Sequence, residues 1–309
     1  MTAPRRILPG SIIMVTLRCT QRRFRLAPSN AVNALVTYLV AVMSVKYRVG
    51  VVAMTWQSNH AHLVVVDHDA RLPAMLQEMN GLLARGLNRI RMMRGSVFER
   101  NNVHMKFLVK PRSIFVALGY IAANPVAAGC VEFGVDWPGI RSQVRHIGRP
   151  GVAVKRPDHL FEKLGGDFLG GLPETGVLMY ELPPSVASDE RGQFIHLAEQ
   201  AVHEAEEKAR AENAAEGVRY LGRARCWNAD PDLQGIAEED HGEDGGSDLI
   251  LATDVETKKE AQKELAVFYK SYVDAWKRWR DGDRGVVFPA GTWKMVRSYG
   301  ANAYPPLLS

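Results

Sequence analysis

The order of hydrophobic patterns in the first 125 residues constrains the fold of this chain most. Segments rich in β-branched residues predict strands, and longer segments with apolar residues three or four positions apart predict helices. They predict strands at 11–18, 49–56, 61–67 and 103–109 and helices at 31–47, 71–94 and 112–123. The order βαββαβ plus a further helix is typical of an α+β fold, a ferredoxin-like or RRM-like antiparallel sheet packed with helices.

Two local signals set helix ends within this pattern. Ser29 stands where an N-cap is expected before the helix 31–47, because its hydroxyl can accept a hydrogen bond from a free backbone N–H. Asn124 precedes Pro125, and the residue before a proline is pushed out of the helical region. The sequence therefore predicts that the last of these helices stops before Asn124.

Two histidines open the strand predicted at 61–67, in the run Ser58-Asn59-His60-Ala61-His62. Side chains alternate between the faces of a strand, so His60 and His62 point the same way and can present two imidazoles to one metal ion. A polar patch on a half-exposed sheet is the alternative interpretation, because a lone His-x-His also occurs by chance.

Tyr120 and Asn124 lie four residues apart on the last predicted helix. Residues at this spacing share one helix face. If this helix packs over the histidine strand, four functional side chains converge, and the combination indicates a tyrosine nucleophile assisted by a metal ion. The alternative is a packed aromatic residue followed by a helix stop.

Both motifs resemble those of the REP-associated tyrosine transposases, which are small HUH single-tyrosine transposases. That family has Met-x-Asn-His-x-His-Leu-Leu and Tyr-Ile-His-Leu-Asn-Pro-Val-Arg-Ala-Gly where this chain has its residues 56–64 and 120–129. The resemblance also includes residues 95–100 and the basic strand around Lys106. It departs at Ala122 and Ala127, where the family usually has His and Arg, and this departure concerns phosphate or DNA contacts.

The resemblance implies a specific chemistry. Tyr120 would attack a phosphodiester of single-stranded, hairpin-bearing DNA, forming a 5′-phosphotyrosine link and a free 3′-hydroxyl that later rejoins strands. His60 and His62 would hold a divalent metal ion, Mg²⁺ or Mn²⁺, with the Asn124 amide oxygen as third ligand. A homodimer is possible, because the tyrosine helix serves a partner's site in some relatives and its own site in others.

Charge is distributed unevenly along the 309 residues. Residues 1–150 contain 20 Lys and Arg against 6 Asp and Glu, a net charge of +14, whereas the remainder carries −9. Such a basic half attracts phosphate backbones. The DNA-contacting candidates are Arg18, Arg22, Arg23, Arg85, Arg89, Arg100, Lys106 and Lys110.

The sequence predicts a change of character near residue 150. Residues 1–150 would form the DNA-nicking domain, and residues 151–309 a mainly helical accessory extension. Residues 148–157 are predicted to be a linker, 191–216 and 255–281 helices, and 238–248 an acidic mobile segment. Trp276, Trp279 and Trp293 either stack on bases or pack in a core.

No apolar run approaches the roughly 18 residues that span a bilayer, and the N-terminus lacks the pattern of a signal peptide. Three widely separated cysteines form no metal-binding spacing. We therefore expect a cytoplasmic, nucleoid-associated protein without a membrane partner.

Other classes stay open. A domesticated, non-catalytic DNA-binding protein that recognises repetitive palindromic elements would keep the fold and the basic surface. A relaxase or replication initiator would use the same chemistry. His68 and His104 are further candidates for metal or base roles, although lone histidines are usually ordinary surface or core residues.

Overall fold

The computed structural model describes residues 4–99, 103–157, 172–235 and 249–306. Its first half contains the predicted strands and helices in the predicted order. They are β1 (Ser11–Arg18), the short 3-10 helix η1 (Thr20–Arg22), α1 (Asn30–Tyr47), β2 (Val49–Trp56), β3 (His60–Asp67), α2 (Leu72–Ile90), β4 (His104–Leu108) and α3 (Pro111–Ala127). The cap of α1 is confirmed, since the Val32 N–H donates to Ser29 Oγ at 3.2 Å.

Five strands form one sheet in the order β2-β3-β1-β4-β7. β1 pairs antiparallel with β3 and with β4, and β2 pairs antiparallel with β3. The fifth strand, β7 (Ile250–Leu251), pairs parallel with β4. The α+β class is confirmed, but the sheet is mixed rather than purely antiparallel, because a segment more than a hundred residues downstream adds a strand at its edge.

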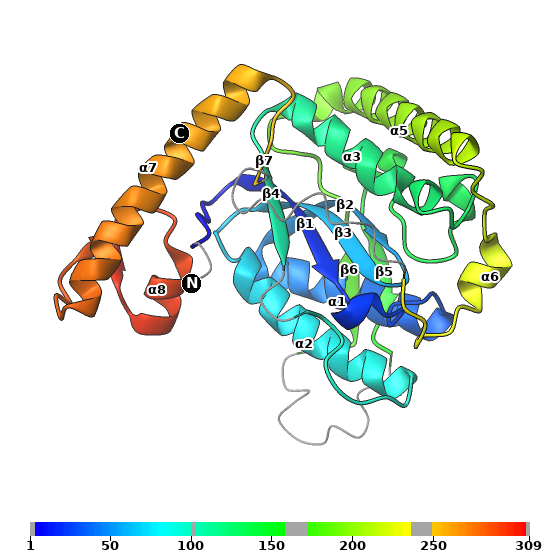
Figure 1. Ribbon diagram of the computed structural model, residues 1–309, viewed down its shortest axis with the longest axis horizontal. Helices are drawn as coiled ribbons and strands as arrows, with labels where there is room; N and C mark the ends of the chain where they lie inside the picture. The colour runs from blue at the N-terminus through cyan, green and yellow to red at the C-terminus, as the bar shows by residue number, and fades with distance from the viewer. Residues whose placement is uncertain (1–3, 100–102, 158–171, 236–248, 307–309) are drawn as a thin grey trace.

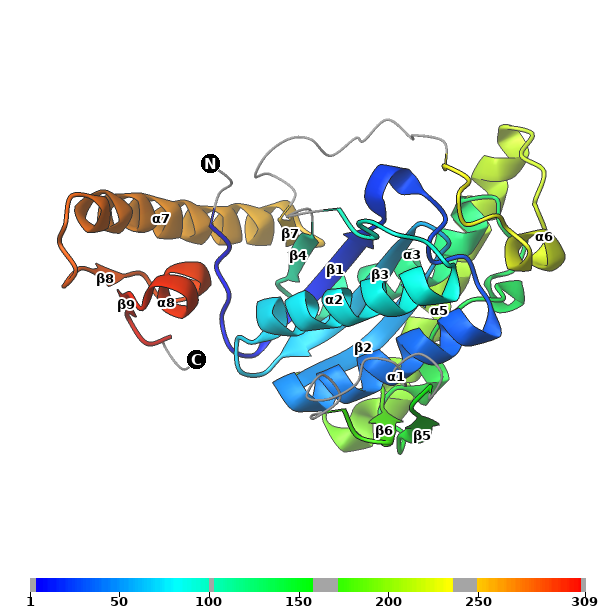
Figure 2. The same cartoon turned by 90° about the horizontal axis from the view of Figure 1, so that it is seen from below.

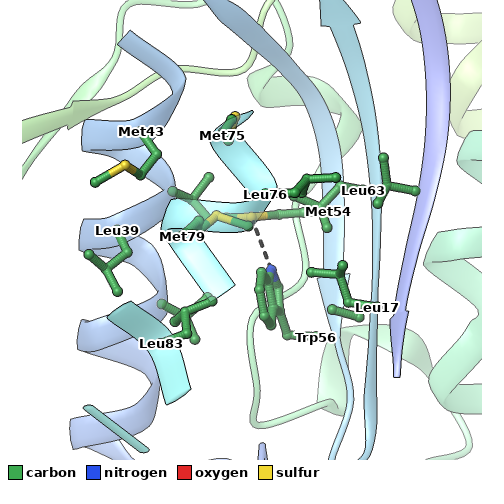
Figure 3. Close-up of a cluster of buried hydrophobic side chains, with 14 of the residues drawn as sticks. Leu17, Leu39, Met43, Met54, Trp56, Leu63, Met75, Leu76, Met79 and Leu83 are labelled. Atoms are coloured by element: carbon green, nitrogen blue, oxygen red, sulfur yellow. Dashed lines mark hydrogen bonds between the residues drawn. The ribbon is translucent and has the colours of Figure 1, made fainter. Parts of the chain in front are cut away.

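Helices α1 and α2 cover one face of the sheet (Figure 2). Leu17 and Leu63 of the sheet belong to one buried cluster with Leu39 of α1 and with Met79 and Leu83 of α2 (Figure 3). Each such side chain contributes roughly 1.5–3 kcal/mol when fully buried. A one-residue slip of a strand would turn this set toward the other face, so the cluster fixes the strand register.

Helices α3 and α5 (Arg191–Ala215) lie on the other face (Figure 1). Val64 and Val66 of β3 form a second buried cluster with Leu118 and Ile121 of α3 and Ala198 of α5. α3 is therefore held between the sheet and α5. α3 therefore lies against the side of β3 that carries the even-numbered residues.

The predicted stop before Asn124 is wrong. α3 continues through Pro125 to Ala127, and the chain then turns at Gly129, whose φ is +64°. A proline lacks the N–H of the helical ladder and its ring crowds the carbonyl of the residue four positions earlier, so a helix that continues through it needs compensating contacts. The last turn is held in other ways, since the Asn213 side chain of α5 donates to the Val126 carbonyl at 2.7 Å and the Ala128 N–H donates to the Asn124 carbonyl at 3.0 Å. Asn124 consequently keeps its helical position one turn after Tyr120.

The predicted linker at 148–157 is also wrong in part. It contains β5 (Val152–Lys155), which pairs antiparallel with β6 (Thr175–Leu178). Gly176 of this hairpin approaches α1 so closely that a Cβ there would lie 2.9 Å from Val42 Cγ2. The local pattern could not reveal this strand because its partner lies twenty residues away. The predicted acidic segment at 238–248 lies outside the described residues.

The remaining elements follow α3 along the chain. They are η2 (Gly134–Asp136), η3 (Val144–His146), η5 (Ser188–Glu190), α6 (Arg223–Trp227), α7 (Val255–Arg280), β8 (Val287–Phe288), α8 (Trp293–Tyr299) and β9 (Asn302–Ala303). The predicted helices at 191–216 and 255–281 are confirmed as α5 and α7. Within the described ranges, no helix combines the length and the apolar character needed to cross a membrane.

The C-terminal elements build a small core of their own around Phe288 and Met295. Trp276 and Trp279 pack against it, with Arg280 5.2 Å from the Trp276 ring and Arg284 4.5 Å from the Trp279 ring. Both tryptophans thus have a packing role. The main core, in contrast, combines elements from both sides of residue 150, since Phe194 and Ala198 of α5 join the sheet cluster. The division at residue 150 stays a prediction.

Gly119 sets the separation of α3 and α5. A Cβ at Gly119 would lie 2.7 Å from the Ala201 carbonyl oxygen. We expect Gly119→Ala to lower the free energy of unfolding by roughly 1–3 kcal/mol, because the backbone of α5 must shift. Gly192→Ala is the matched control within α5, where an added Cβ meets nothing within 4 Å. Urea unfolding curves measure both, and equal midpoints for the two variants would contradict the close approach.

Candidate active site

The two histidines lie on the α3 side of β3. Antiparallel pairing places Arg18 opposite His60 and Thr16 opposite His62. Side chains opposite one another in a sheet share a face, and the Thr16 Oγ1 lies 3.0 Å from His62 Nδ1 accordingly. The two imidazole rings are in edge contact, with centroids 4.8 Å apart.

Tyr120 and Asn124 of α3 meet these histidines. The Tyr120 ring centroid lies 5.2 Å from that of His62, and Asn124 Oδ1 lies 2.9 Å from His60 Nε2. The Gln57 side-chain amide also donates to Asn124 Oδ1. Tyr120 is half exposed, whereas His62 is buried. The structure therefore brings together the four residues that the two motifs single out.

The environment keeps both imidazoles neutral. Burial lowers the pKa of His60 to about 4; the hydrogen bond with Asn124 opposes this effect, and the guanidiniums of Arg18 and Arg22 add to it. Burial, with the positive charge of Lys106 and Arg18 and the neighbouring His60, lowers the pKa of His62 well below its ordinary value. A neutral imidazole has one N–H and one lone pair, so each ring can serve as a metal ligand at neutral pH.

The arrangement of polar atoms fits a divalent cation. His62 Nε2 is buried without a hydrogen-bond partner, and if its Nδ1–H donates to Thr16 the lone pair stands on Nε2. His60 has a single N–H but two acceptor oxygens beside its nitrogens, Asn59 Oδ1 at 2.7 Å and Asn124 Oδ1 at 2.9 Å. A cation ligated by His60, His62 and Asn124 would satisfy the lone pair on His62 Nε2 and would use the remaining lone pair of Asn124 Oδ1 beside the Gln57 hydrogen bond.

The ligand set is nevertheless a sparse one. Among the described residues, no group of three or more His, Cys, Asp or Glu side chains could hold a metal ion. Two imidazoles and one amide oxygen would leave the other coordination positions to water and to phosphate oxygens. Such a set suits Mn²⁺ at least as well as Mg²⁺, because imidazole nitrogen is a softer ligand than oxygen.

The basic candidates divide between the two faces of the sheet. Arg18 lies opposite His60, Lys106 stands on the same side of β4, and Arg22 is close enough to His60 to affect its pKa. Arg85 and Arg89 are on α2, which covers the opposite face. They lie away from the histidines for this reason.

The other basic candidates have identified contacts or fall outside the structure. Lys110 lies 3.5 Å from an Asp254 carboxylate oxygen at the start of α7. Arg23 lies 3.1 Å from an Asp232 carboxylate oxygen. Arg100 lies outside the described residues.

Sequence reasoning missed the residues that hold the site side chains. Thr16, Gln57 and Asn59 contact His62, Asn124 and His60 respectively. Gln57 and Asn59 flank the histidine motif and could have been noticed there, whereas only strand register places Thr16. Of the additional histidines, His68 pairs with Glu181 at 2.8 Å near the other end of β3, and His104 lies across from Thr16 on β4.

Comparison with known proteins gives little beyond this geometry. No protein-family model matches the chain, and no curated protein matches it. A solved structure described as a REP-associated tyrosine transposase bound to a REP hairpin is similar over 47% of this chain and 85% of that chain, with 17% sequence identity and a TM-score of 0.40. This is a distant structural likeness that gives no residue correspondence.

Metal binding can be measured without any substrate. We expect Mn²⁺ titration, followed by the electron paramagnetic resonance signal of free Mn²⁺, to reveal one site that His62→Ala weakens by at least about tenfold, since even outer-shell changes cost about 10–100-fold. His68→Ala is the matched control. It also removes one imidazole, but His68 pairs with Glu181 near the other end of β3, away from the site. Equal Mn²⁺ affinity of wild type and His62→Ala would exclude His62 as a ligand.

Proposed function

We propose that this chain cleaves and rejoins single-stranded DNA through a covalent tyrosine intermediate, with a divalent cation at His60, His62 and Asn124. The observation that carries the proposal is the meeting of α3 with β3. It places a half-exposed tyrosine in ring contact with a buried histidine, 5.2 Å between centroids, and an amide oxygen 2.9 Å from a second histidine.

In this reaction the Tyr120 hydroxyl oxygen attacks a backbone phosphorus. A bond forms between the tyrosine oxygen and phosphorus, the bond from phosphorus to the 3′ oxygen breaks, and that oxygen leaves as a 3′-hydroxyl after taking up a proton. The phosphate ester stays on the tyrosine, so attack by a 3′-hydroxyl can reverse the step and join strands. A bound divalent cation supplies charge neutralisation at the phosphate oxygens.

The chain's own residues orient the reacting groups. Thr16 and Asn59 hold the Nδ1 atoms of His62 and His60, and Gln57 holds the Asn124 oxygen. Such supporting contacts fix ring orientation and the nitrogen that carries the lone pair. Tyr120, being half exposed, is open to a strand that approaches from solvent.

The surroundings also favour a polyanion. The order β2-β3-β1-β4 with antiparallel pairing supports the ferredoxin-like fold that we infer, and the α3 side of this sheet carries Arg18 and Lys106 beside the histidines. We infer from the two motifs that the chain is a REP-associated tyrosine transposase of the HUH class and that its substrate is a hairpin-bearing strand. A homodimer belongs to the same proposal.

A non-catalytic DNA-binding protein is the second candidate. Ala122 and Ala127 favour it, since the family usually has His and Arg at these places. Ala122 is buried in α3, and its carbonyl accepts a hydrogen bond from Arg141 at 2.9 Å. The methyl groups of Ala122 and Ala127 offer no hydrogen-bond donor to a phosphate. DNA binding and DNA cleavage therefore have to be measured separately.

Covalent attachment identifies the nucleophile. Incubation with labelled hairpin-bearing single-stranded DNA and Mn²⁺ should give an adduct that survives denaturing electrophoresis, and Tyr120→Phe should abolish it while DNA affinity is kept. Tyr299→Phe is the control, because Tyr299 is similarly exposed but lies on α8. Adduct formation by Tyr120→Phe would assign the nucleophile to another residue, and binding without any adduct would favour the non-catalytic protein.

The salt dependence of binding tests which face meets DNA. Each neutralised phosphate of a single strand contributes about 0.7 to the slope of log affinity against log salt. Lys106→Gln should therefore reduce the slope by about 0.7. Arg89→Gln, on the exposed side of α2, should leave it unchanged. The reverse outcome would place the DNA on the α1 and α2 face.

A further inference from the structure

We propose that Arg23 and Arg25 form a phosphodiester-binding site beside the histidine pair, and that Asp232 of the same chain occupies this site until a nucleic acid displaces it. This inference rests on the proposed function in one respect, since the displacing ligand is taken to be the backbone of single-stranded DNA. It goes beyond that function by assigning a competitor within the chain.

A single carboxylate oxygen bridges the two arginines. Asp232 Oδ1 lies 3.1 Å from Arg23 Nη1 and 3.3 Å from Arg25 Nη2. Arginine binds phosphate oxygens as it binds carboxylate oxygens, because the planar guanidinium presents several donors to an anionic oxygen. The carboxylate therefore stands where a phosphate oxygen would bind.

The segment that carries Asp232, residues 228–235, is hydrogen-bonded to the basic loop after β1. The Phe24 N–H donates to the Leu233 carbonyl at 2.9 Å, and the Gly235 N–H donates to the Arg22 carbonyl at 3.0 Å. We call residues 228–235 the acidic strap. Its position is set by these backbone contacts of the residues directly after Asp232, so the carboxylate does not reach the arginines by side-chain rotation alone.

The same loop adjoins the histidine motif. The Cys19 N–H donates to the Asn59 carbonyl at 2.8 Å, and Asn59 Oδ1 lies 2.7 Å from His60 Nδ1. A Cβ on Gly235 would lie 2.6 Å from Asn59 Nδ2, so the acidic strap itself touches the turn before His60. A phosphate at Arg23 and Arg25 would therefore belong to the strand segment next to the cleavage site.

The ion pairs have the strength expected of a displaceable contact. The side chains of Asp232 and Arg23 are 53% and 38% exposed, and exposed ion pairs contribute about 0–1 kcal/mol. Arg25 is only 14% exposed, so its guanidinium gains more from a permanent anionic neighbour. A strand that offers several phosphates at once can replace one carboxylate while leaving Arg25 paired.

Competition of this kind has a measurable consequence. Removing the charge of Asp232 should tighten binding of a labelled single-stranded oligonucleotide to the full chain, measured by fluorescence anisotropy at low salt with a chelator. The expected gain for Asp232→Asn is about two- to fivefold, the change that corresponds to the strength of such ion pairs. Asp230→Asn is the matched control, because it changes the net charge equally. Asparagine keeps the side-chain oxygen Oδ1, which accepts a hydrogen bond from the Asp232 N–H at 2.9 Å.

A second variant tests whether the arginines mediate the effect. In an Arg23→Gln background, Asp232→Asn should give a smaller gain, because one of the two arginines that the carboxylate occupies is already lost. The site would be supported if Asp232→Asn increases DNA affinity less in the Arg23→Gln background than in the wild type and if Asp230→Asn has little effect. Equal tightening by Asp230→Asn and Asp232→Asn would overturn it, since the effect would then be one of overall charge.

These outcomes separate the inference from the proposed function. If wild type binds the oligonucleotide and forms the Tyr120 adduct while Asp232→Asn binds no more tightly, the competing site is wrong and the cleavage proposal stands. If neither wild type nor any variant binds DNA, both proposals fail. If Asp232→Asn gains affinity but Tyr120 forms no adduct, the site is supported and the non-catalytic protein is favoured.

Discussion

The packing of α3 between the sheet and α5 is the contact on which the candidate site depends. Ile121 of α3 belongs to the same buried cluster as Val64 and Val66, and Gly119 lets the backbone of α5 approach from behind. Tyr120 and Asn124 reach the histidines only while this arrangement holds. Stability of the fold and geometry of the site are consequently coupled through one helix.

The site lies where the apolar face of β3 ends. Along one side of this strand, Val66 and Val64 are buried in the core. His62 and His60 continue the same row toward the first residue of the strand. A buried His62 with an unpartnered Nε2 costs about 1–3 kcal/mol of desolvation. A bound ion is one of the recognised explanations of such an unsatisfied atom, and a cation would satisfy this one.

Opposite charges from the two halves of the chain meet in the folded protein. The excess of basic residues before residue 150 predicts a half of the chain that attracts phosphate backbones. Asp232 lies on Arg23 and Arg25, and Asp254 lies near Lys110, so the acidic half covers part of the basic surface. Net charge by segment therefore overstates the number of arginines and lysines that face solvent alone.

The elements of the first half and their order could be predicted from the residues alone. Strands and helices there have strong periodic patterns, and periodicity acts over a few residues, so it can be read locally. The same patterns put His60 and His62 on one side of a strand and Tyr120 and Asn124 on one side of a helix. Whether the strand and the helix face each other was a hypothesis that no local pattern could test.

The remaining features depend on contacts between distant parts of the chain. Helix α3 continues through Pro125 because Asn213 of α5 and the turn at Gly129 hold its last turn. Thr16 reaches His62 through strand register, and Cys226 lies 3.4 Å from the Cys130 carbonyl although 96 residues separate them. Asp232 reaches Arg23 across 209 residues, about twice that separation. Such contacts depend on how distant segments pack together, and that packing leaves no periodic signal in the residues themselves.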